Sequence, residues 1–152
     1  MANRKYLLIC KNEHVLPLPV IDKIVDKVLL LEHYKLDLGH CKAIGSSLEQ
    51  LGNYIRKIEL NENGINDEGF SYIINGAIKN RHIKALVIKN NEFKALSLKA
   101  ILRYFEIKNP ILEELIISGC KTKLSQTNEL LKELSDYNNL KRLGFSSMKL
   151  DK

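Results

Sequence analysis

The chain has 152 residues, of which 45% are hydrophobic, and its formal net charge is +6. This length predicts one domain that can bury a continuous core. Because no apolar run approaches the roughly 18 residues that a membrane-spanning helix requires, the composition excludes a membrane span of that kind.

Residues 1–33 are predicted to form an N-terminal cap. Residues 6–10 resemble a strand, and residues 20–32 resemble a helix because their apolar residues share one helical face. Pro17 and Pro19 separate the two elements. The first apolar run is too short for a secretory signal peptide, whereas a short organellar presequence stays open.

A shortened structural unit is predicted to follow the cap. Its strand would contain Leu36 and Leu38, with His33 before them and Cys41 after them, and the next unit begins at Ile55. We expect this unit to be the first and least regular member of a repeat, since terminal repeats are usually atypical.

A pattern of apolar residues, apolar-x-x-apolar-x-apolar, then recurs four times. The spacing is 28 residues from Ile55 to Ile83, 29 from Ile83 to Leu112 and 28 from Leu112 to Leu140. The members are Ile55, Ile58 and Leu60; Ile83, Leu86 and Ile88; Leu112, Leu115 and Ile117; and Leu140, Leu143 and Phe145. A constant period of this length predicts stacked repeats, each contributing a short strand.

A helical segment is predicted after each of the first three of these strands. Asp67 is expected to cap a helix whose buried face includes Phe70, Ile73 and Ile74. The next helix is expected after Ser97, and the last after Ser125 or Thr127. Chain returns are predicted at Asn80, at 109–110 and at 138–139.

The four copies resemble the leucine-rich-repeat family, specifically its ribonuclease-inhibitor-like subclass. The resemblance covers roughly residues 34–150 and is strongest for the first full copy. The residues that match the family pattern there are Ile55, Ile58, Leu60, Asn63, Ile65 and Gly69. In the later copies Asn91, Cys120 and Met148 stand where the first has Asn63, so the match weakens along the chain.

This resemblance implies an α/β solenoid, a short arc with parallel strands on its concave face and helices on its convex face. We expect about five strands in one domain, 1–152, with repeats over 34–152 and a truncated last repeat. The sequence given stops at Lys152, so the strand at Phe145 is expected to lack a helix of its own. Its edge would be blunted by Lys149, Asp151 and Lys152, or covered by another chain.

The three cysteines, Cys10, Cys41 and Cys120, lack the paired spacing of a disulfide framework or a zinc site. Cys41 and Cys120 are interpreted as the last core position of a repeat. Buried, reduced thiols favour an intracellular, cytoplasmic location, with cytoskeletal or mitochondrial association left open.

The sequence predicts no enzyme, no cofactor and no metal site. His40 adjoins Cys41, but neighbouring residues on a strand point to opposite faces and could not form a catalytic pair. None of the common phosphate-loop, metalloprotease or nucleophile-elbow motifs occurs.

Outward-facing strand residues are expected to line the concave surface and bind a protein partner. Three columns are predicted: Lys35, Lys57, Ala85, Glu114 and Arg142; Asp37, Glu59, Val87, Ile116 and Gly144; and Gly39, Asn61, Lys89, Ser118 and Ser146. The apolar centre at Val87 and Ile116 within a mixed polar rim is typical of protein interfaces.

The stretch 79–108 carries eight basic residues against two acidic ones. Lys99 and Arg103 are predicted to lie on the convex helices, where they could bind an acidic protein partner. Nucleic acid is the alternative partner, for example in a ribonucleoprotein, with Tyr104 as the candidate stacking residue. The expected function is that of a non-catalytic adaptor or structural subunit of a larger assembly, cytoskeletal, ciliary or mitochondrial.

Overall fold

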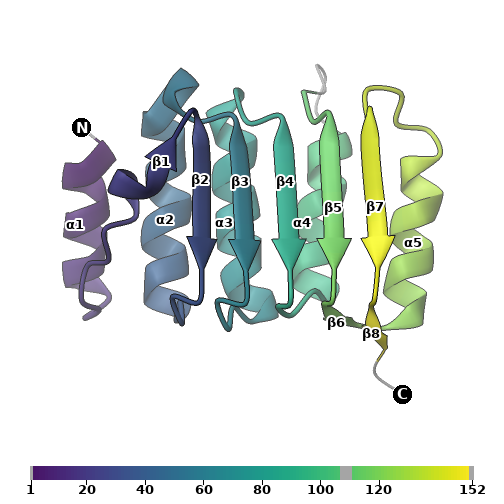
Figure 1. The fold of residues 1–152 in the computed structure, drawn as a ribbon, viewed down its shortest axis with the longest axis horizontal. Coiled ribbons are helices and arrows are strands. Elements are labelled where there is room, and N and C mark those ends of the chain that lie inside the picture. The colour runs from purple at the N-terminus through teal and green to yellow at the C-terminus, as the bar shows by residue number, and fades with distance from the viewer. Residues whose placement is uncertain (1, 107–110, 151–152) are drawn as a thin grey trace.

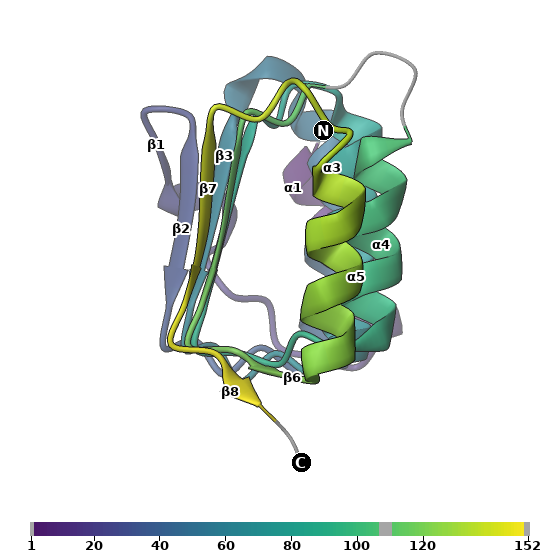
Figure 2. The ribbon, with the colours of Figure 1, turned by 90° about the vertical axis from the view of Figure 1, so that its right-hand side faces the viewer.

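The computed structural model describes residues 2–106 and 111–150, which form a sheet with all its long helices on one face (Figures 1 and 2). The helices are α1 (Ala2–Asn12), α2 (Leu38–Leu51), α3 (Asp67–Asn80), α4 (Ala95–Phe105) and α5 (Leu124–Leu134), with 3-10 turns at Ile21–Lys23 and Gly52–Tyr54. The strands are β1 (Ile24–Val25), β2 (Val28–Glu32), β3 (Lys57–Asn61), β4 (Ala85–Lys89), β5 (Glu114–Ser118), β6 (Lys121–Thr122), β7 (Arg142–Ser146) and β8 (Lys149–Leu150). Lys108, the predicted return at 109–110, and the charges Asp151 and Lys152 lie outside the described residues.

The main sheet has the strand order β1-β2-β3-β4-β5-β7. From β2 to β7 all pairs are parallel and in repeat register, so that Ile58, Leu86, Leu115 and Leu143 lie side by side. The four strands predicted from the triplets are confirmed. This mixed arrangement, with a parallel sheet under a layer of helices, agrees with the predicted α/β class.

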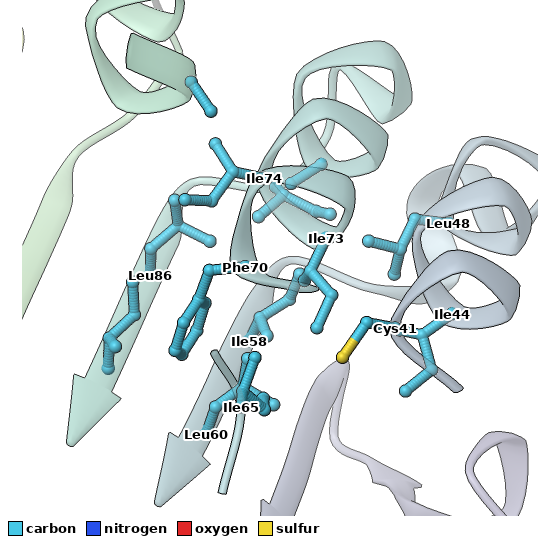
Figure 3. Packing of buried hydrophobic residues seen from close by; sticks show 14 of the residues in the cluster. Cys41, Ile44, Leu48, Ile58, Leu60, Ile65, Phe70, Ile73, Ile74 and Leu86 are labelled. Carbon is cyan, nitrogen blue, oxygen red and sulfur yellow. The ribbon is translucent and has the colours of Figure 1, made fainter. Parts of the chain in front are cut away.

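The core lies between the sheet and the helices because alternate strand residues point toward the helix layer. Above β3 and β4, the residues Phe70, Ile73 and Ile74 of α3 pack over Ile58 and Leu86 (Figure 3). All five side chains are at most 2% exposed. The helical face predicted for α3 is thus confirmed.

The prediction of a strand at residues 6–10 is wrong, since these residues belong to α1. Tyr6 and Cys10 stand one helical turn apart and are both buried, while Leu7 and Leu8 are exposed. A one-sided helix of this kind can cover the end of the helix layer, and α1 does so by packing on α2 (Figure 1).

The prediction of a helix over residues 20–32 is also wrong. Here β1 and β2 form a hairpin whose two loop residues, Asp26 and Lys27, both have positive φ. Strand β2 then buries Leu29 and Leu31 completely and exposes Leu30, the alternation of a half-buried strand. Pairing with β3 provides hydrogen-bond partners for the backbone of β2. This tertiary interaction cannot be predicted from the periodicity of the segment alone.

The predicted strand at Leu36 and Leu38 is wrong as well, because the repeat starts earlier. Leu29 pairs with Ile58, so the first repeat has the full length and its strand is β2. Leu38 is the first residue of α2, and Cys41 is a buried helix residue, not the last core position of a repeat. Asp37 caps α2 by accepting a hydrogen bond from the His40 amide at 3.0 Å.

The residues that cap α3 and α4 differ from those predicted. Asn66, not Asp67, caps α3, accepting a hydrogen bond from the Gly69 amide at 2.8 Å. Asp67 reaches across to the next repeat and accepts hydrogen bonds from the Lys94, Leu96 and Ser97 amides at 2.8, 2.8 and 2.9 Å. Lysine has no acceptor, so Lys94 at the N-cap position of α4 cannot supply this cap itself.

Asparagine side chains connect consecutive repeats after β3 and β4. Oδ1 of Asn91 accepts hydrogen bonds from the amides of Asn63 and Ile65, at 3.1 and 3.2 Å. In the same position one repeat later, the thiol of Cys120 donates to the carbonyls of Ile88 and Ser118, at 3.7 and 3.4 Å. This confirms the interpretation of Cys120 as a core position of the repeat.

The closest helix contact joins α2 and α3 at Gly45 and Gly76. A Cβ added to Gly76 would clash with the backbone of Gly45, and one added to Gly45 would clash with the carbonyl of Tyr72. The two helices therefore meet backbone to backbone, and the surface between them carries no side chain at this level.

Candidate partner-binding surfaces

The face of the sheet opposite the helices is not covered by any described element, as Figure 2 shows. We call the outward residues of β2, β3, β4, β5 and β7 the open sheet face. Its three rows are Val28, Lys57, Ala85, Glu114 and Arg142; Leu30, Glu59, Val87, Ile116 and Gly144; and Glu32, Asn61, Lys89, Ser118 and Ser146. The predicted rows are correct from β3 onward.

The first member of each predicted row is wrong. Lys35, Asp37 and Gly39 do not lie on a strand, and Val28, Leu30 and Glu32 take their places. The error follows from the helix predicted over 20–32. Reading the segment as strand would have revealed the signal, because Leu29 and Leu31 precede Ile58 and Leu60 by 29 residues.

Charges of both signs alternate across the open sheet face. Nζ of Lys57 lies 2.6 Å from Oε1 of Glu59 and 3.7 Å from Oε1 of Glu114, which is also 3.6 Å from Nη1 of Arg142. The Glu114 side chain is buried among these cations, and its Oε1 has no hydrogen bond among the described residues. Three cations, Lys57, Lys89 and Arg142, face three carboxylates, Glu32, Glu59 and Glu114, so the face is balanced in charge.

The apolar centre differs in part from the prediction. Val87, between Glu59 and Ile116 in its row, is only 3% exposed, whereas Ile116 is partly exposed. Leu30, at the β2 end of the same row, is 42% exposed. A partner resting on this face would thus meet Leu30 and Ile116 and not Val87, together with Asn61 and the paired charges around them.

The basic residues of the stretch 79–108 that the structure describes lie on different surfaces of the molecule. Lys99 and Arg103 are exposed on α4 as predicted, but Lys89 lies on the open sheet face. Nζ of Lys84 forms an ion pair with Glu113 at 2.5 Å, and Nζ of Lys94 lies 3.1 Å from Glu92. The described part of this stretch, residues 79–106, therefore does not form one basic face.

Tyr104, the residue proposed to stack on bases, is fully buried. Its hydroxyl donates to the carbonyls of Ile83 and Ala77, and burial raises the pKa of the phenol. The neighbouring Phe105 is partly buried against the core and packs on Tyr137 with ring centroids 4.7 Å apart. The prediction of Tyr104 as a stacking residue is therefore wrong.

Comparison with known proteins supports the repeat. The family model of the leucine-rich repeat matches residues 53–73, the segment that contains β3 and the start of α3. This segment of the chain is thus similar to a leucine-rich repeat. A search of curated proteins finds no match.

The fold of the chain is similar to that of a solved structure titled leiomodin-1 actin-binding site 2. The TM-score is 0.66 at 17% identity, and the match covers 92% of this chain and 76% of that one. At this identity the likeness concerns the fold.

The repeat protein's cysteines offer no reactive thiol. Cys10, Cys41 and Cys120 are all fully buried, and burial raises the pKa of each thiol, for Cys41 to about 12. A protonated, buried thiol is a poor nucleophile. Within residues 2–106 and 111–150 no group of three His, Cys, Asp or Glu side chains is arranged to hold a metal ion.

His40 and Cys41 lie on a helix, not on a strand as predicted. Nε2 of His40 lies 2.9 Å from the carbonyl of Leu16, and its Nδ1 lies 2.8 Å from the Asp37 carboxylate. The ring thus joins α2 to the segment that precedes the hairpin.

Of the helices in the described residues, none combines the length and the apolar character that crossing a membrane requires.

Proposed function

We propose that this protein is a non-catalytic adaptor or structural subunit, which binds a protein partner within a larger assembly through the open sheet face. The observation that carries the proposal is the uncovered parallel sheet, whose outer side presents Leu30 and Ile116 among paired charges. Parallel sheets usually have both faces covered, so the uncovered face of this sheet is a candidate surface for binding a partner.

The composition of this face supports a protein partner over other ligands. Partly exposed apolar side chains within a polar rim are the usual anatomy of a protein interface. Lys57, Glu59, Glu114 and Arg142 already lie close to opposite charges within the chain. Such charges would select a partner by complementarity more than by net attraction. The structural neighbour is titled an actin-binding site, which favours a cytoskeletal setting in the cytoplasm.

We also propose the finer architecture that accompanies this role. The full-length repeats, each with one helix of 11 or 14 residues, fit the ribonuclease-inhibitor-like subclass and a short solenoid. We propose one domain over 1–152, with repeats that begin at β2 instead of at residue 34. The segment before β2, including α1, then acts as the cap.

The test replaces Leu30 and Ile116 with lysine in one variant of the full chain. The tagged wild type should recover specific proteins from the cells that produce it, and the variant should lose them by tenfold or more, as quantified by mass spectrometry. A control variant, Lys99→Glu with Lys132→Glu, changes exposed residues of α4 and α5 away from the open sheet face and should retain them. Equal recovery by wild type and the folded open-face variant would contradict the proposal.

Nucleic acid is the second candidate partner, favoured by the exposed Lys99 and Arg103 on α4. The dispersal of the other basic residues and the burial of Tyr104 argue against it. It predicts RNA or DNA binding that weakens with salt, by about 0.9 log unit per log unit of salt for each duplex phosphate neutralised. Charge reversal at Lys99 and Arg103 should then abolish binding.

A further inference from the structure

A groove crosses the helix layer on the side of the molecule opposite the open sheet face. Its cavity volume is about 530 Å³, and its lining includes Lys5 of α1, Gly45 of α2, Tyr72, Gly76 and Lys79 of α3, and Arg103 of α4. Helices α1 to α4 lie in this order (Figure 1). Residues distant in sequence thus meet at one surface.

The groove exists because Gly45 and Gly76 bring α2 and α3 together backbone to backbone. Neither glycine contributes a side chain, so the floor is low where the two helices touch. Lys5 on α1 and Arg103 on α4 stand on either side of this floor. The contact that tightens the helix layer therefore also creates a trough in its surface.

The charges of the groove are unbalanced, unlike those of the open sheet face. Lys5, Lys79 and Arg103 line it together with a single carboxylate, Glu49. Among the described residues none of the three cations forms an ion pair, and Arg103 only donates a hydrogen bond to Asn75 at 3.4 Å. Net positive charge in a concave surface attracts an anionic partner.

The remaining lining favours a peptide as that partner. The ring of Tyr72, 39% exposed, is held by the ammonium of Lys42 at 5.7 Å, and Ile9 and Ile78 add apolar surface. Among the described residues, Tyr72 supplies the one aromatic ring of the groove, whereas single-stranded nucleic acid stacks on several successive rings. A carboxylate-bearing segment with an apolar side chain would satisfy both kinds of lining.

We propose that this groove binds an acidic segment of a protein partner, whose carboxylates pair with Lys5, Lys79 and Arg103 while an apolar side chain lies over Gly45 and Gly76. This site is independent of the open sheet face, so either can fail without the other.

The probe is a short, labelled poly-glutamate peptide with one central leucine, titrated into the full chain. Amide NMR shifts should concentrate at Gly45, Ser46, Asn75 and Gly76, and fluorescence anisotropy should report saturable binding. Lys5→Glu combined with Lys79→Glu should weaken binding at least tenfold. The matched control, Arg56→Glu with Lys132→Glu, makes the same change in net charge at exposed positions outside the groove and should weaken it less than threefold.

Several results would overturn the proposal. Shifts distributed over the surface, or equal losses in the two charge-reversed variants, would show non-specific attraction to a basic protein. Tighter binding of oligouridine RNA, or of vesicles containing phosphatidylserine, with shifts at the same amides would assign the groove to another class of partner. Heat unfolding of each variant confirms that the fold is intact, and Lys79→Gln alone provides a milder variant.

Discussion

The middle repeats and the last repeat share the same pattern of residues, yet they differ in how fully the apolar side chains are buried and the polar groups hydrogen-bonded. In the middle, Leu86 is 2% exposed, and Asn91 bonds to the backbone of the preceding repeat. In the last repeat, Leu143 occupies the same strand position and is 48% exposed. One repeat sequence thus supports a closed core in one place and an incomplete one in another.

The chemistry of the strand ends follows the same gradient. Asn91 both donates and accepts, Cys120 is observed only to donate, and the thioether of Met148 has no donor. The hydroxyl of Thr122 is buried without a hydrogen-bond partner among the described residues. We infer that stability decreases toward β7 because connections between repeats weaken there, which the following predictions examine.

The largest contrast is expected from shortening the same side chain in two repeats. Leu86→Ala should lower the free energy of unfolding by about 3 kcal/mol, since it leaves a cavity in a closed core. Leu143→Ala should cost less than about 1 kcal/mol, because half of that side chain is already in water. Urea unfolding of both variants measures the difference, and equal losses would refute the gradient.

Removing the asparagine connection should have the next largest effect. Asn91→Ala leaves the buried amides of Asn63 and Ile65 without acceptors, at an expected cost of about 2 to 3 kcal/mol. Cys120→Ala should cost about 1 kcal/mol. Asn128→Ala, an exposed asparagine on α5, serves as control and should leave the unfolding midpoint almost unchanged; a similar loss at all three positions would argue against the role of these connections.

The cap from Asp67 predicts a smaller loss with a defined pH dependence. Burial alone would raise the pKa of Asp67, but hydrogen bonds from Ser97, Leu96 and Lys94 outweigh it and lower the pKa below its ordinary value. The stabilisation is therefore present above the pKa of the unfolded chain and lost as pH falls through the lowered pKa. Asp67→Ala should cost about 1 kcal/mol at neutral pH and less in acid.

The matched control for this cap is Glu68→Ala, which removes a neighbouring exposed carboxylate. Thermal unfolding of both variants and the wild type, at neutral and acidic pH, separates the two effects. A wild type and an Asp67→Ala variant that differ equally at both pH values would show that ionisation of this group does not matter.

The smallest effect is expected at Glu113, which directly precedes β5 and pairs with one lysine from the repeat on each side. Hydrogen bonds from Lys141, at 2.7 Å, and Lys84, at 2.5 Å, lower the pKa of this carboxyl to about 2. NMR titration of its side-chain carbon should show this midpoint, and it should rise when either lysine is changed to methionine or when salt is added. Glu113→Gln should destabilise less than Asp67→Ala does; an ordinary glutamate midpoint would show that the cluster does not persist in solution.

The sequence predicts the structure well where adjacent repeats share the same apolar pattern, and poorly where a segment departs from that pattern. From Ile55 onward the period fixed the strands, their register and the rows of the open sheet face. Residues 20–32 were misassigned because a run such as Val28–Glu32 fits helical and strand periodicity equally well, and only pairing with β3 decides between them. The groove was missed because Gly45 and Gly76 are far apart in sequence and carry no signal beyond their size.

The cap that Asp67 provides has a consequence for how the molecule unfolds. Its carboxylate belongs to one repeat and the helix that it caps belongs to the next, so α4 loses its cap whenever the segment around Asp67 opens. Such shared groups increase the coupling between neighbouring repeats relative to the stability of each alone. We therefore expect the middle repeats to exchange their amide hydrogens as one cooperative unit, and β7 to open before them.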